Sequence, residues 1–534
     1  MKYCSLCLLW LLCCMSCTSS RKADQPTARL AVIPTIDQVG APRLPEAIAP
    51  VTAPFPLPAF NKPVFPALTI SIIEQGATQQ GLATKAIQSA IDVVSHRGGG
   101  TVTVPAGKWL TGRIHLKSNV NLHIAEGAEL HFSGAVEDYR PAVFTRNEGI
   151  ELMSLGALIY ANGQENIAVT GKGTLIGPAS GSLKDQIMTT DVIENVVPLD
   201  KPVSERVYEG YNKEVIFPPM FISPINCRNV YIEGVTLRQT PFWNIVPVYC
   251  DGVIIRGVSV YSVGIPRGDG IDIESSRNVL IEYCTLSSGD DCFTIKAGRG
   301  EDGMRVNRPS ENIVIRHCLA LEGHGGITLG SETAGMIRNV SVQDCVFSET
   351  GVGIRFKTRR PRGGGGENIY YERIRMILRG EAFKFDMLGS KTHVGELAER
   401  LPARAINAYT PRFRDITAKD LVIEKASMFV DISGIPESPV ENLLIENALV
   451  KTSKKLIAAR DVKRFTVRNT IVITDDSVIS VLDGRQILFD SVIFKTSGRL
   501  RMKQAGDLTD SIRFQQCTPA KPMDWLSDSW RRQE

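Results

Sequence analysis

The feature that most constrains the fold of this 534-residue chain is a short segment that recurs along it at similar intervals. Each copy begins with Asn or Gly and continues with β-branched and aliphatic residues. The copies start at Asn166, Asn229, Gly252, Asn278, Asn312, Asn339, Asn368 and Asn442. The five spacings between Asn229 and Asn368 are 23, 26, 34, 27 and 29 residues. One β-rich unit per interval of this length predicts a stack of coils, so we expect an all-β fold, a right-handed single-stranded parallel β-helix.

Other segments are expected to cover the ends and edges of this stack. Residues 83–95 carry apolar side chains at helical spacing and predict a helix that caps the open N-terminal end. The side chains of this stripe are Ala86, Ile87, Ala90, Ile91 and Val94. Two long segments without the repeat, at about 179–216 and 386–409, are expected to rise from coil corners as loops. After about Leu482 the repeat fades, which predicts a last coil and a tail.

Residues 1–17 have the pattern of an export signal. One lysine precedes an apolar run that is too short to span a bilayer. The run ends in Ser16-Cys17-Thr18, which resembles a bacterial lipoprotein signal, in which the cysteine carries the lipid. We therefore expect an exported protein anchored to a membrane through Cys17 alone, in the periplasm or outer membrane of a Gram-negative bacterium.

Composition narrows the remaining possibilities. Residues 18–66 are rich in proline and predict an extended tether, followed by one domain over residues 67–534. The formal net charge of +4 is too small to indicate a nucleic-acid partner. Five of the twelve cysteines fall in the first 17 residues, and those in strand-like segments are expected as small buried side chains. No set with zinc spacing follows residue 17, so we expect no metal or other cofactor, and we expect a monomer.

Four short polar signatures interrupt the repeats. They are Arg267-Gly-Asp269-Gly-Ile-Asp272, Gly289-Asp290-Asp291-Cys292, Gly323-His324-Gly325-Gly326 and Arg355-Phe-Lys357. Because the signatures flank strand-like segments in successive coils, we expect them at one edge of the stack. Carboxylates, a histidine and two cations at a common edge are the groups that acid/base hydrolysis of an acidic sugar polymer needs.

The ordered set of motifs resembles glycoside hydrolase family 28, the polygalacturonase family, over roughly residues 68–460. Besides the last three signatures, the resemblance includes Gly99-Gly-Thr-Val-Thr-Val-Pro-Ala-Gly107 and Pro241-Phe-Trp243. Three features are more similar to the bacterial exo-acting members: Lys296-Ala-Gly-Arg299, Leu329-Gly-Ser-Glu332 and residues 359–366. The resemblance implies inverting hydrolysis of α-linked galacturonosyl bonds in pectin or pectic oligosaccharides, more from chain ends than within the chain.

The resemblance also implies a role for each aspartate. Asp290 is the general acid, and Asp269 and Asp291 hold and deprotonate the attacking water. Asp269 and Asp290 are 21 residues apart, about one coil, so their strands are expected about 4.8 Å apart. Repulsion among three close carboxylates is expected to raise one pKa and keep an acid protonated. Strand alternation would send Asp290 and Asp291 to opposite faces, so a bend or bulge is expected to turn both toward the cleft.

The remaining signatures supply nitrogen groups. The resemblance implies that His324 tunes the acid and contacts sugar. Arg355 and Lys357, two residues apart and therefore on one strand face, grip a uronate carboxylate by the same resemblance. Lys296 is expected to add a cation at a neighbouring subsite. A further run is either a solvated basic corner or a site for a second acidic sugar: Arg359, Arg360 and Arg362.

The chain departs from the family pattern at Arg267-Gly268, where Asn and a small residue normally precede the aspartate. We expect Arg267 near the sugar, and the departure leaves a rhamnogalacturonan or a substituted galacturonan open as the substrate. Two other readings share the fold. A pectate lyase would need a calcium cluster and an arginine base, whereas paired aspartates and Gly-His-Gly dominate here. A non-catalytic carbohydrate-binding β-helix would not need the complete set of acid, base and cation residues.

Overall fold

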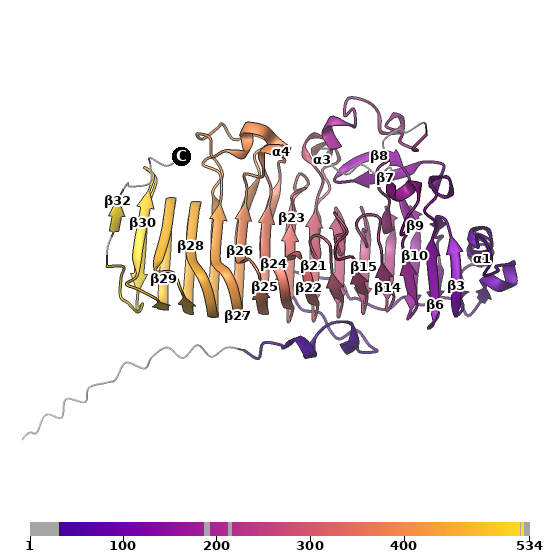
Figure 1. The fold of residues 1–534 in the computed structure, drawn as a ribbon, viewed down its shortest axis with the longest axis horizontal. Helices are drawn as coiled ribbons and strands as arrows, with labels where there is room; N and C mark the ends of the chain where they lie inside the picture. Colours follow the sequence, from indigo (N-terminus) through magenta and orange to yellow (C-terminus); the bar gives the residue numbers. More distant parts are fainter. Residues whose placement is uncertain (1–30, 186–192, 212–215, 524, 528–534) are drawn as a thin grey trace, which may run out of the picture.

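The computed structural model describes residues 31–185, 193–211, 216–523 and 525–527. Its strands lie side by side along one long axis, from α1 (Thr84–His96) at one end to β32 (Trp525–Ser527) at the other (Figure 1). The strands of successive coils pair in parallel. The fold is the right-handed parallel β-helix that the repeat predicts.

Each coil contributes strands to three parallel arrays. The site array, which carries the polar signatures, contains β9 (Ala157–Asn162), β12 (Met220–Ile225), β17 (Ile271–Glu274), β20 (Phe293–Lys296), β22 (Leu319–Leu329), β24 (Val346–Lys357) and β26 (Glu381–Asp386). The repeat array contains β1 (Thr69–Ser71), β2 (Gly100–Val104), β5 (Val120–Ile124), β10 (Glu165–Gly171), β13 (Arg228–Glu233), β15 (Asp251–Arg256), β18 (Arg277–Glu282), β21 (Ser310–Arg316), β23 (Ile337–Gln343) and β25 (Gly365–Leu378). The third array contains β3 (Gly107–Thr111), β6 (Ala128–Phe132), β11 (Thr174–Ile176), β14 (Thr236–Arg238), β16 (Ser259–Tyr261) and β19 (Thr285–Ser287).

The recurring asparagines mark the same corner in successive coils, where Gly252 and Asp415 replace asparagine in two coils. Asn278, Asn312 and Asn339 have φ angles of 57°, 57° and 55°, the left-handed conformation that asparagine tolerates best after glycine. The side-chain amide of Asn312 donates to Oδ1 of Asn278 at 3.3 Å, and that of Asn339 donates to Oδ1 of Asn312 at 3.0 Å. The repeat is therefore selected by a turn conformation and by the amide ladder that stacks along it.

Buried side chains line up from coil to coil in the site array. One fully buried column consists of Ile271, Phe293, Ile327, Ile354 and Phe383. Because strand side chains alternate between faces, the next residue of each strand points outward. That outward row consists of Asp272, Thr294, Thr328, Arg355 and Lys384. The register that packs the core thus also aligns polar side chains on the outer face.

The predicted N-terminal helix covers the end of the stack. All five residues of its apolar stripe are buried, and α1 packs against β1, β2 and β5. The seven cysteines of the described residues are free and buried, as expected of small core side chains. The stack extends further past Leu482 than the last coil that the sequence predicts. After β27 (Arg412–Ser433) and β28 (Val440–Thr474), the parallel stack continues through β29 (Val478–Thr496), β30 (Arg501–Ala505) and β31 (Asp510–Gln515).

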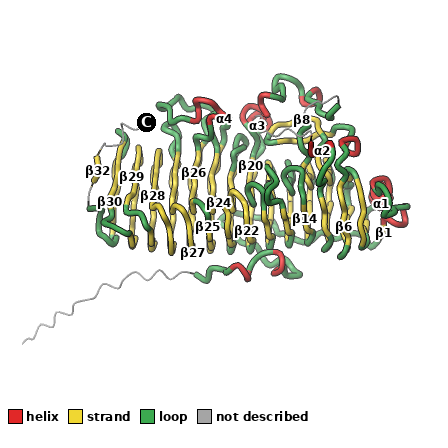
Figure 2. The backbone as a smooth tube through the Cα atoms, in the orientation of Figure 1, coloured by secondary structure: helices red, strands yellow, loops and turns green. Residues whose placement is uncertain are grey.

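The insertions rise on one side of the stack, where short red helices gather in Figure 2. The first carries α2 (Ser182–Asp185), η5 (Ile193–Asn195) and η6 (Val203–Glu205), and the second carries α4 (Lys391–Val394) and η7 (Gly395–Ala398). Two further elements on this side were not expected from the sequence. They are the antiparallel hairpin of β7 (Val143–Asn147) with β8 (Ile150–Ser154), and α3 (Gly300–Val306).

Residues 31–66, which we call the N-terminal strap, do not form the expected spacer. They run along the stack on the side opposite the insertions (Figure 1). Ile48, Phe55 and Leu57 are among the strap side chains that pack on an apolar patch of the repeat array. This patch consists of Ala168, Tyr231, Ile254, Leu280 and Val314. The extended, proline-rich backbone is retained, but its apolar side chains have found a surface to cover.

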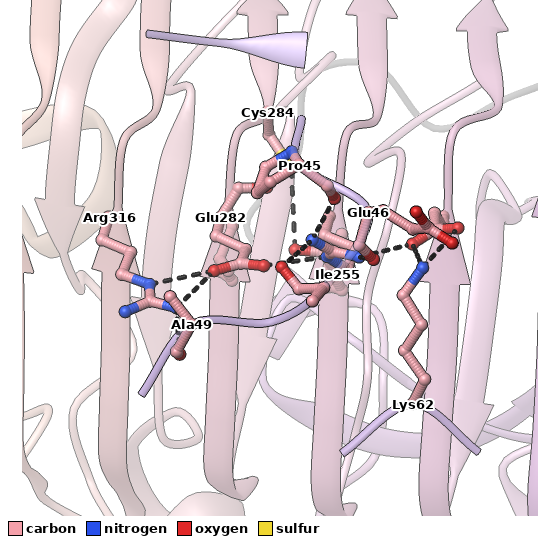
Figure 3. Close-up of polar contacts among 12 residues, drawn as sticks. Pro45, Glu46, Ala49, Lys62, Ile255, Glu282, Cys284 and Arg316 are labelled. Atoms are coloured by element: carbon pink, nitrogen blue, oxygen red, sulfur yellow. Dashed lines mark hydrogen bonds and ion pairs between the residues drawn. The ribbon is translucent and has the colours of Figure 1, made fainter. Parts of the chain in front are cut away.

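Buried arginines hold the strap carbonyl groups (Figure 3). Arg256, fully buried, donates to the carbonyl oxygens of Pro45 at 2.8 Å and Glu46 at 3.2 Å. Arg316 donates to the carbonyl oxygen of Ala49 at 2.8 Å. Both arginines also pair with the buried carboxylate of Glu282, at 2.8 Å and 2.7 Å. An unpaired strap backbone could not be buried without such donors.

The N-terminal signal lies outside the described residues, so lipid attachment at Cys17 stays a prediction. Among the residues that the structure describes, none of the helices is both long and apolar enough to cross a bilayer.

Candidate active site

The site array brings the four polar signatures to one outer face. Asp269 precedes β17 by two residues, and Asp291 precedes β20 by two residues. His324 lies within β22, and Arg355 and Lys357 lie within β24. Since β17, β20, β22 and β24 are consecutive neighbours in the array, the chemistry-bearing residues of four coils form one cluster.

The chain bends at Gly289-Asp290, which resolves the expected conflict with strand alternation. The Asp290 side chain is 28% exposed and Oδ1 lies 2.9 Å from Nδ1 of His324, whose own side chain is 63% exposed. This hydrogen bond raises the pKa of His324, because the nearby carboxylate favours the imidazolium. Asp290 and His324 are thus an open acid–imidazole pair that substrate can reach.

Asp291, the next residue, is fully buried beneath cations of the outer face. Its Oδ1 accepts from Arg355 at 3.1 Å and its Oδ2 accepts from Lys357 at 2.7 Å. Burial opposes ionisation of Asp291, but the charges of Lys357 and Arg355 outweigh it and hold the pKa of this carboxyl well below its usual range. Arg355 and Lys357 each keep 22% of the side chain exposed, so the cations that hold Asp291 also face the cleft.

A glycine makes the close approach to Asp291 possible. A Cβ at Gly325 would lie 2.7 Å from Oδ1 of Asp291 and 2.4 Å from Oγ1 of Thr328. No side chain larger than hydrogen fits there. The glycine after His324 is therefore required by the buried carboxylate beneath it, in addition to any close approach of substrate.

Asp269 lies beside a second buried carboxylate and one cation. Lys296 Nζ is 3.3 Å from Oδ2 of Asp269 and 3.1 Å from Oδ1 of Asp272. Burial raises the pKa of Asp272 to about 6, and burial together with the charge of Asp272 raises the pKa of Asp269 well above its ordinary value. The Asp269 position is held from the backbone, because the amide of Asn244 donates to its carbonyl oxygen at 2.8 Å.

Lys296 differs from its expected role as a substrate-binding cation. Its side chain is 4% exposed, and its ammonium lies 4.0 Å from the centroid of the Trp243 ring, a cation–π contact. It also lies 3.7 Å from Oε2 of Glu332. With carboxylates and an indole around it, Lys296 supports the site from below and does not face the cleft.

Arg267, the departure from the family pattern, contacts the β7–β8 hairpin beside the site. Its Nη1 lies 3.0 Å from Oε1 of Glu148, which stands in the β7–β8 hairpin turn. Arg299 contacts the same carboxylate at 3.1 Å and also pairs with Glu194 of the first insertion at 3.0 Å. The loop that positions Asp269 is therefore tied to the inserted wall by charge.

The basic run after β24 is not a solvated corner. Arg359, Arg360 and Arg362 are all buried. Arg360 forms an ion pair with Glu437 at 2.5 Å, and Arg359 donates to Oγ of Ser331 at 3.0 Å. Arg362 lies 3.6 Å from Glu332, which Arg299 also contacts at 3.1 Å. These arginines organise the floor beside the site.

Sequence reasoning left two site residues without a role. Asp272 was visible in the first signature, but alone it resembled a turn aspartate. Glu332 was visible in Leu329-Gly-Ser-Glu332. Only the fold shows that its carboxylate contacts three buried cations, Lys296, Arg299 and Arg362. Among the described residues, no group of three or more His, Cys, Asp and Glu side chains could hold a metal ion.

A parallel β-helix with an exposed aspartate–histidine pair beside buried carboxylates and cleft-facing cations has the groups of an acid/base hydrolase. Comparison with known proteins makes this specific. The profile of glycosyl hydrolases family 28 matches residues 209–378. A probable polygalacturonase of Vitis vinifera is 30% identical over 402 residues, which cover 72% of this chain and 74% of the relative.

Other similar proteins include an exo-poly-alpha-D-galacturonosidase of Dickeya chrysanthemi, 27% identical over 67% of this chain and 62% of the relative. The crystal structure of an exopolygalacturonase from Thermotoga maritima matches with a TM-score of 0.65 and 30% identity, over 79% of this chain and 93% of that one. The chain belongs to glycosyl hydrolases family 28 and is a glycoside hydrolase.

Proposed function

We propose that this hydrolase cleaves α-linked galacturonosyl bonds in pectin or pectic oligosaccharides, with inversion and from the chain end. The single observation that carries the proposal is the arrangement around the aspartate pair. Asp290 is open and hydrogen-bonded to His324, while Asp291 is buried and gripped by Arg355 and Lys357. The names of the similar proteins from Vitis, Dickeya and Thermotoga point to the same class of substrate.

The proposed reaction divides the carboxyl groups by environment. Asp290, with the proton that it shares with His324, protonates the glycosidic oxygen as the bond to the anomeric carbon breaks. Asp269 and Asp291 hold a water on the opposite side of the sugar ring and accept its proton as the water attacks. The product has inverted configuration because the attacking water and the leaving group are on opposite faces.

Cations of the same cluster select an acidic sugar. Arg355 and Lys357 are anchored by Asp291 and remain partly exposed, so a uronate carboxylate can approach them from the cleft. A guanidinium offers paired donors and an ammonium a point charge, which together fix the ring relative to Asp290. A neutral hexose would offer these cations no second carboxylate beside Asp291.

Chain-end action is supported by the exo-acting names of two similar proteins and by the walls of the cleft. Glu148 of the hairpin and Glu194 of the first insertion are both tied to Arg299. Walls fixed to the floor in this way would limit how far a long chain extends beyond the scissile bond.

The Arg267 observation favours a second candidate substrate. In place of a short amide beside Asp269, the chain has a guanidinium that contacts Glu148. This changes the shape and charge of the wall near the sugar. A rhamnogalacturonan or a xylose-substituted galacturonan is the alternative substrate that such a change would suit.

The test is incubation with defined oligogalacturonides, rhamnogalacturonan and xylogalacturonan oligosaccharides, following product size and anomeric configuration over time. We expect stepwise loss of terminal uronates as the inverted anomer. A ladder of mid-sized fragments would contradict chain-end action, and retained configuration would contradict the mechanism.

Asp290→Asn is the matched variant for this test. It keeps the side-chain shape but cannot donate the proton, so turnover should fall by about 10²–10⁴-fold while oligosaccharide binding persists. Unchanged turnover would show that Asp290 is not the acid. Activity of the unaltered protein on none of these glycans would remove the proposed substrate class.

A further inference from the structure

Asp269 and Asp272 share one cation between two buried carboxyl groups. Lys296 is within ion-pair distance of both, at 3.3 Å and 3.1 Å. Neither aspartate has another ion pair among the residues that the structure describes. The carboxyls are at most 5% exposed, so water cannot supply the missing neutralisation.

The neighbouring carboxylates are neutralised separately. Asp291 has two cations of its own, Arg355 and Lys357. Glu332 lies 3.7 Å from Lys296, but Arg299 is closer to it at 3.1 Å. The excess negative charge of the cluster therefore belongs to the Asp269–Asp272 pair.

A buried carboxyl pair with one compensating charge does not ionise fully near neutral pH, and its protons titrate as a unit. Burial raises the pKa of both groups, the charge of Asp272 raises the pKa of Asp269 further, and the pKa of Asp272 lies at about 6. A general base is most effective when its pKa is near the working pH. Asp291, with its pKa held low by Lys357 and Arg355, is a poor proton acceptor by the same rule.

We propose that Asp269, and not Asp291, takes the proton from the attacking water, and that Asp272 and Lys296 are positioning residues that set the lowest pH at which Asp269 can do so. This inference rests on the proposed inverting hydrolysis and divides its two base candidates. Asp291 remains ionised and anchors the cations and the water. Asp269 holds the proton of the pair more tightly than Asp272, so Asp269 becomes a base only above the pH at which the pair releases that proton.

One proton is taken up and one is given up by the two aspartates in this step. As the water oxygen bonds to the anomeric carbon, its proton passes to a carboxylate oxygen of Asp269, and the glycosidic oxygen leaves with the proton of Asp290. After release of both products, Asp269 returns its proton to solvent and Asp290 regains one. No other reactant is needed.

Several charged groups surround Asp269. Asp272 faces it from β17, Lys296 from β20, and Asp290 and Asp291 from the bend before β20. The others act through these: His324 on Asp290, Arg355 and Lys357 on Asp291, and Glu332 on Lys296. Of these groups, only Asp272 and Lys296 act directly on Asp269 without contacting Asp290, Arg355 or Lys357.

The test compares the acidic limb of kcat/KM against pH in two variants, using whichever glycoside the unaltered protein hydrolyses. Asp272→Asn removes the repelling carboxyl, so the limb should move to lower pH by about one unit. Lys296→Met removes the compensating charge, so the limb should move to higher pH by about 1–3 units. A role limited to folding would lower activity without moving the two limbs in opposite directions.

Thr294→Val is the matched control, because Thr294 is the register partner of Asp272 on β20 and carries no charge. Its acidic limb should stay in place. If Lys296→Met does not fold, as judged by thermal melting, Asp272→Asn against Thr294→Val decides alone. A limb that stays unmoved in Asp272→Asn overturns the inference and leaves Asp291 as the base, whereas inactivity of the unaltered protein on every galacturonan overturns the proposed substrate instead.

Discussion

The aspartates of the site differ in protonation because their immediate partners differ. Asp290 has an imidazole, Asp291 has two cations, and Asp269 shares one cation with Asp272. The same side-chain chemistry can therefore supply an acid, an anchor and a base within two neighbouring strands. Residue type alone does not separate these roles.

Replacing His324 by Asn should separate acid tuning from substrate binding. The hydrogen bond to Asp290 raises the pKa of His324, so the imidazolium persists above its ordinary titration range and the pair keeps its proton as pH rises. Without it, we expect kcat to fall by about 10²-fold and the alkaline limb of the pH profile to move to lower pH. Steady-state kinetics between about pH 4 and pH 9, where imidazole and carboxyl groups titrate, would measure the fall in kcat and the shift of the limb.

His317→Asn is the control for this variant. His317 stacks on Tyr283 with ring centroids 4.8 Å apart and directly follows β21 of the repeat array. Its pH profile should match that of the unaltered protein. An unmoved alkaline limb in His324→Asn would contradict a shared proton.

At the scale of elements, the strap and the insertions complete opposite sides of a regular stack. The coils alone leave an apolar patch on the repeat array and ionic groups beside it. The strap covers this patch and supplies backbone carbonyls to Arg256 and Arg316. On the side of the insertions, the β7–β8 hairpin contacts Arg267 through Glu148.

Arg256→Met should therefore destabilise the fold strongly. Arg256 is buried and pairs with Glu282, and its loss would leave that carboxylate and the strap carbonyls short of a donor. We expect the free energy of unfolding to fall by about 3–5 kcal/mol. Urea denaturation followed by circular dichroism would measure the change.

Lys62→Met provides the contrast on the same strap. Lys62 pairs with Glu233 at 3.0 Å, but its side chain is 38% exposed. Its loss should cost less than about 1 kcal/mol. Similar losses in the two variants would show that burial of the arginine network is not what holds the strap.

At the scale of the whole molecule, each coil contacts mainly its neighbours. Phe489 in β29 stacks on Phe514 with centroids 4.8 Å apart and is fully buried. The site coils lie much earlier in the stack, at β17 to β24. In such a fold, stability is approximately a sum of local and nearest-neighbour terms.

Phe489→Ala should loosen the C-terminal coils and leave the site intact. We expect about 3–5 kcal/mol of lost local stability, since a large aromatic side chain is removed from the core. Hydrogen exchange should rise in β29 to β31, with kcat within about twofold of the unaltered value at 25 °C. Faster exchange at β17 to β24 as well would show one cooperative unit.

The sequence also predicts how the molecule is held in the cell. Cys17→Ser removes the proposed lipid attachment residue, so the exported protein should move from the membrane fraction to the soluble fraction. Lipid labelling in growing cells should be lost in parallel. A membrane-bound Cys17→Ser protein, still carrying label, would contradict anchoring at Cys17.

The sequence alone determined the architecture and the members of the site. A left-handed turn at each coil favours asparagine, so the coil length is written in the spacing of Asn278, Asn312 and Asn339. Register then aligns the residues at and beside equivalent strands, which is why Asp269, Asp290 and His324 could be placed together. These are local or periodic properties, and local sequence encodes them directly.

Only the tertiary structure decided what each polar residue contacts. Lys296 was expected to contact substrate and is buried beside Asp269, and of two adjacent aspartates Asp290 is partly exposed while Asp291 is buried. The strap looked like a spacer because its surface partner is formed by residues more than 100 positions away in the chain. The direction of a side chain, its burial and its distant partners depend on how coils and insertions pack around one another. The spacing of residues within a single strand does not encode this packing.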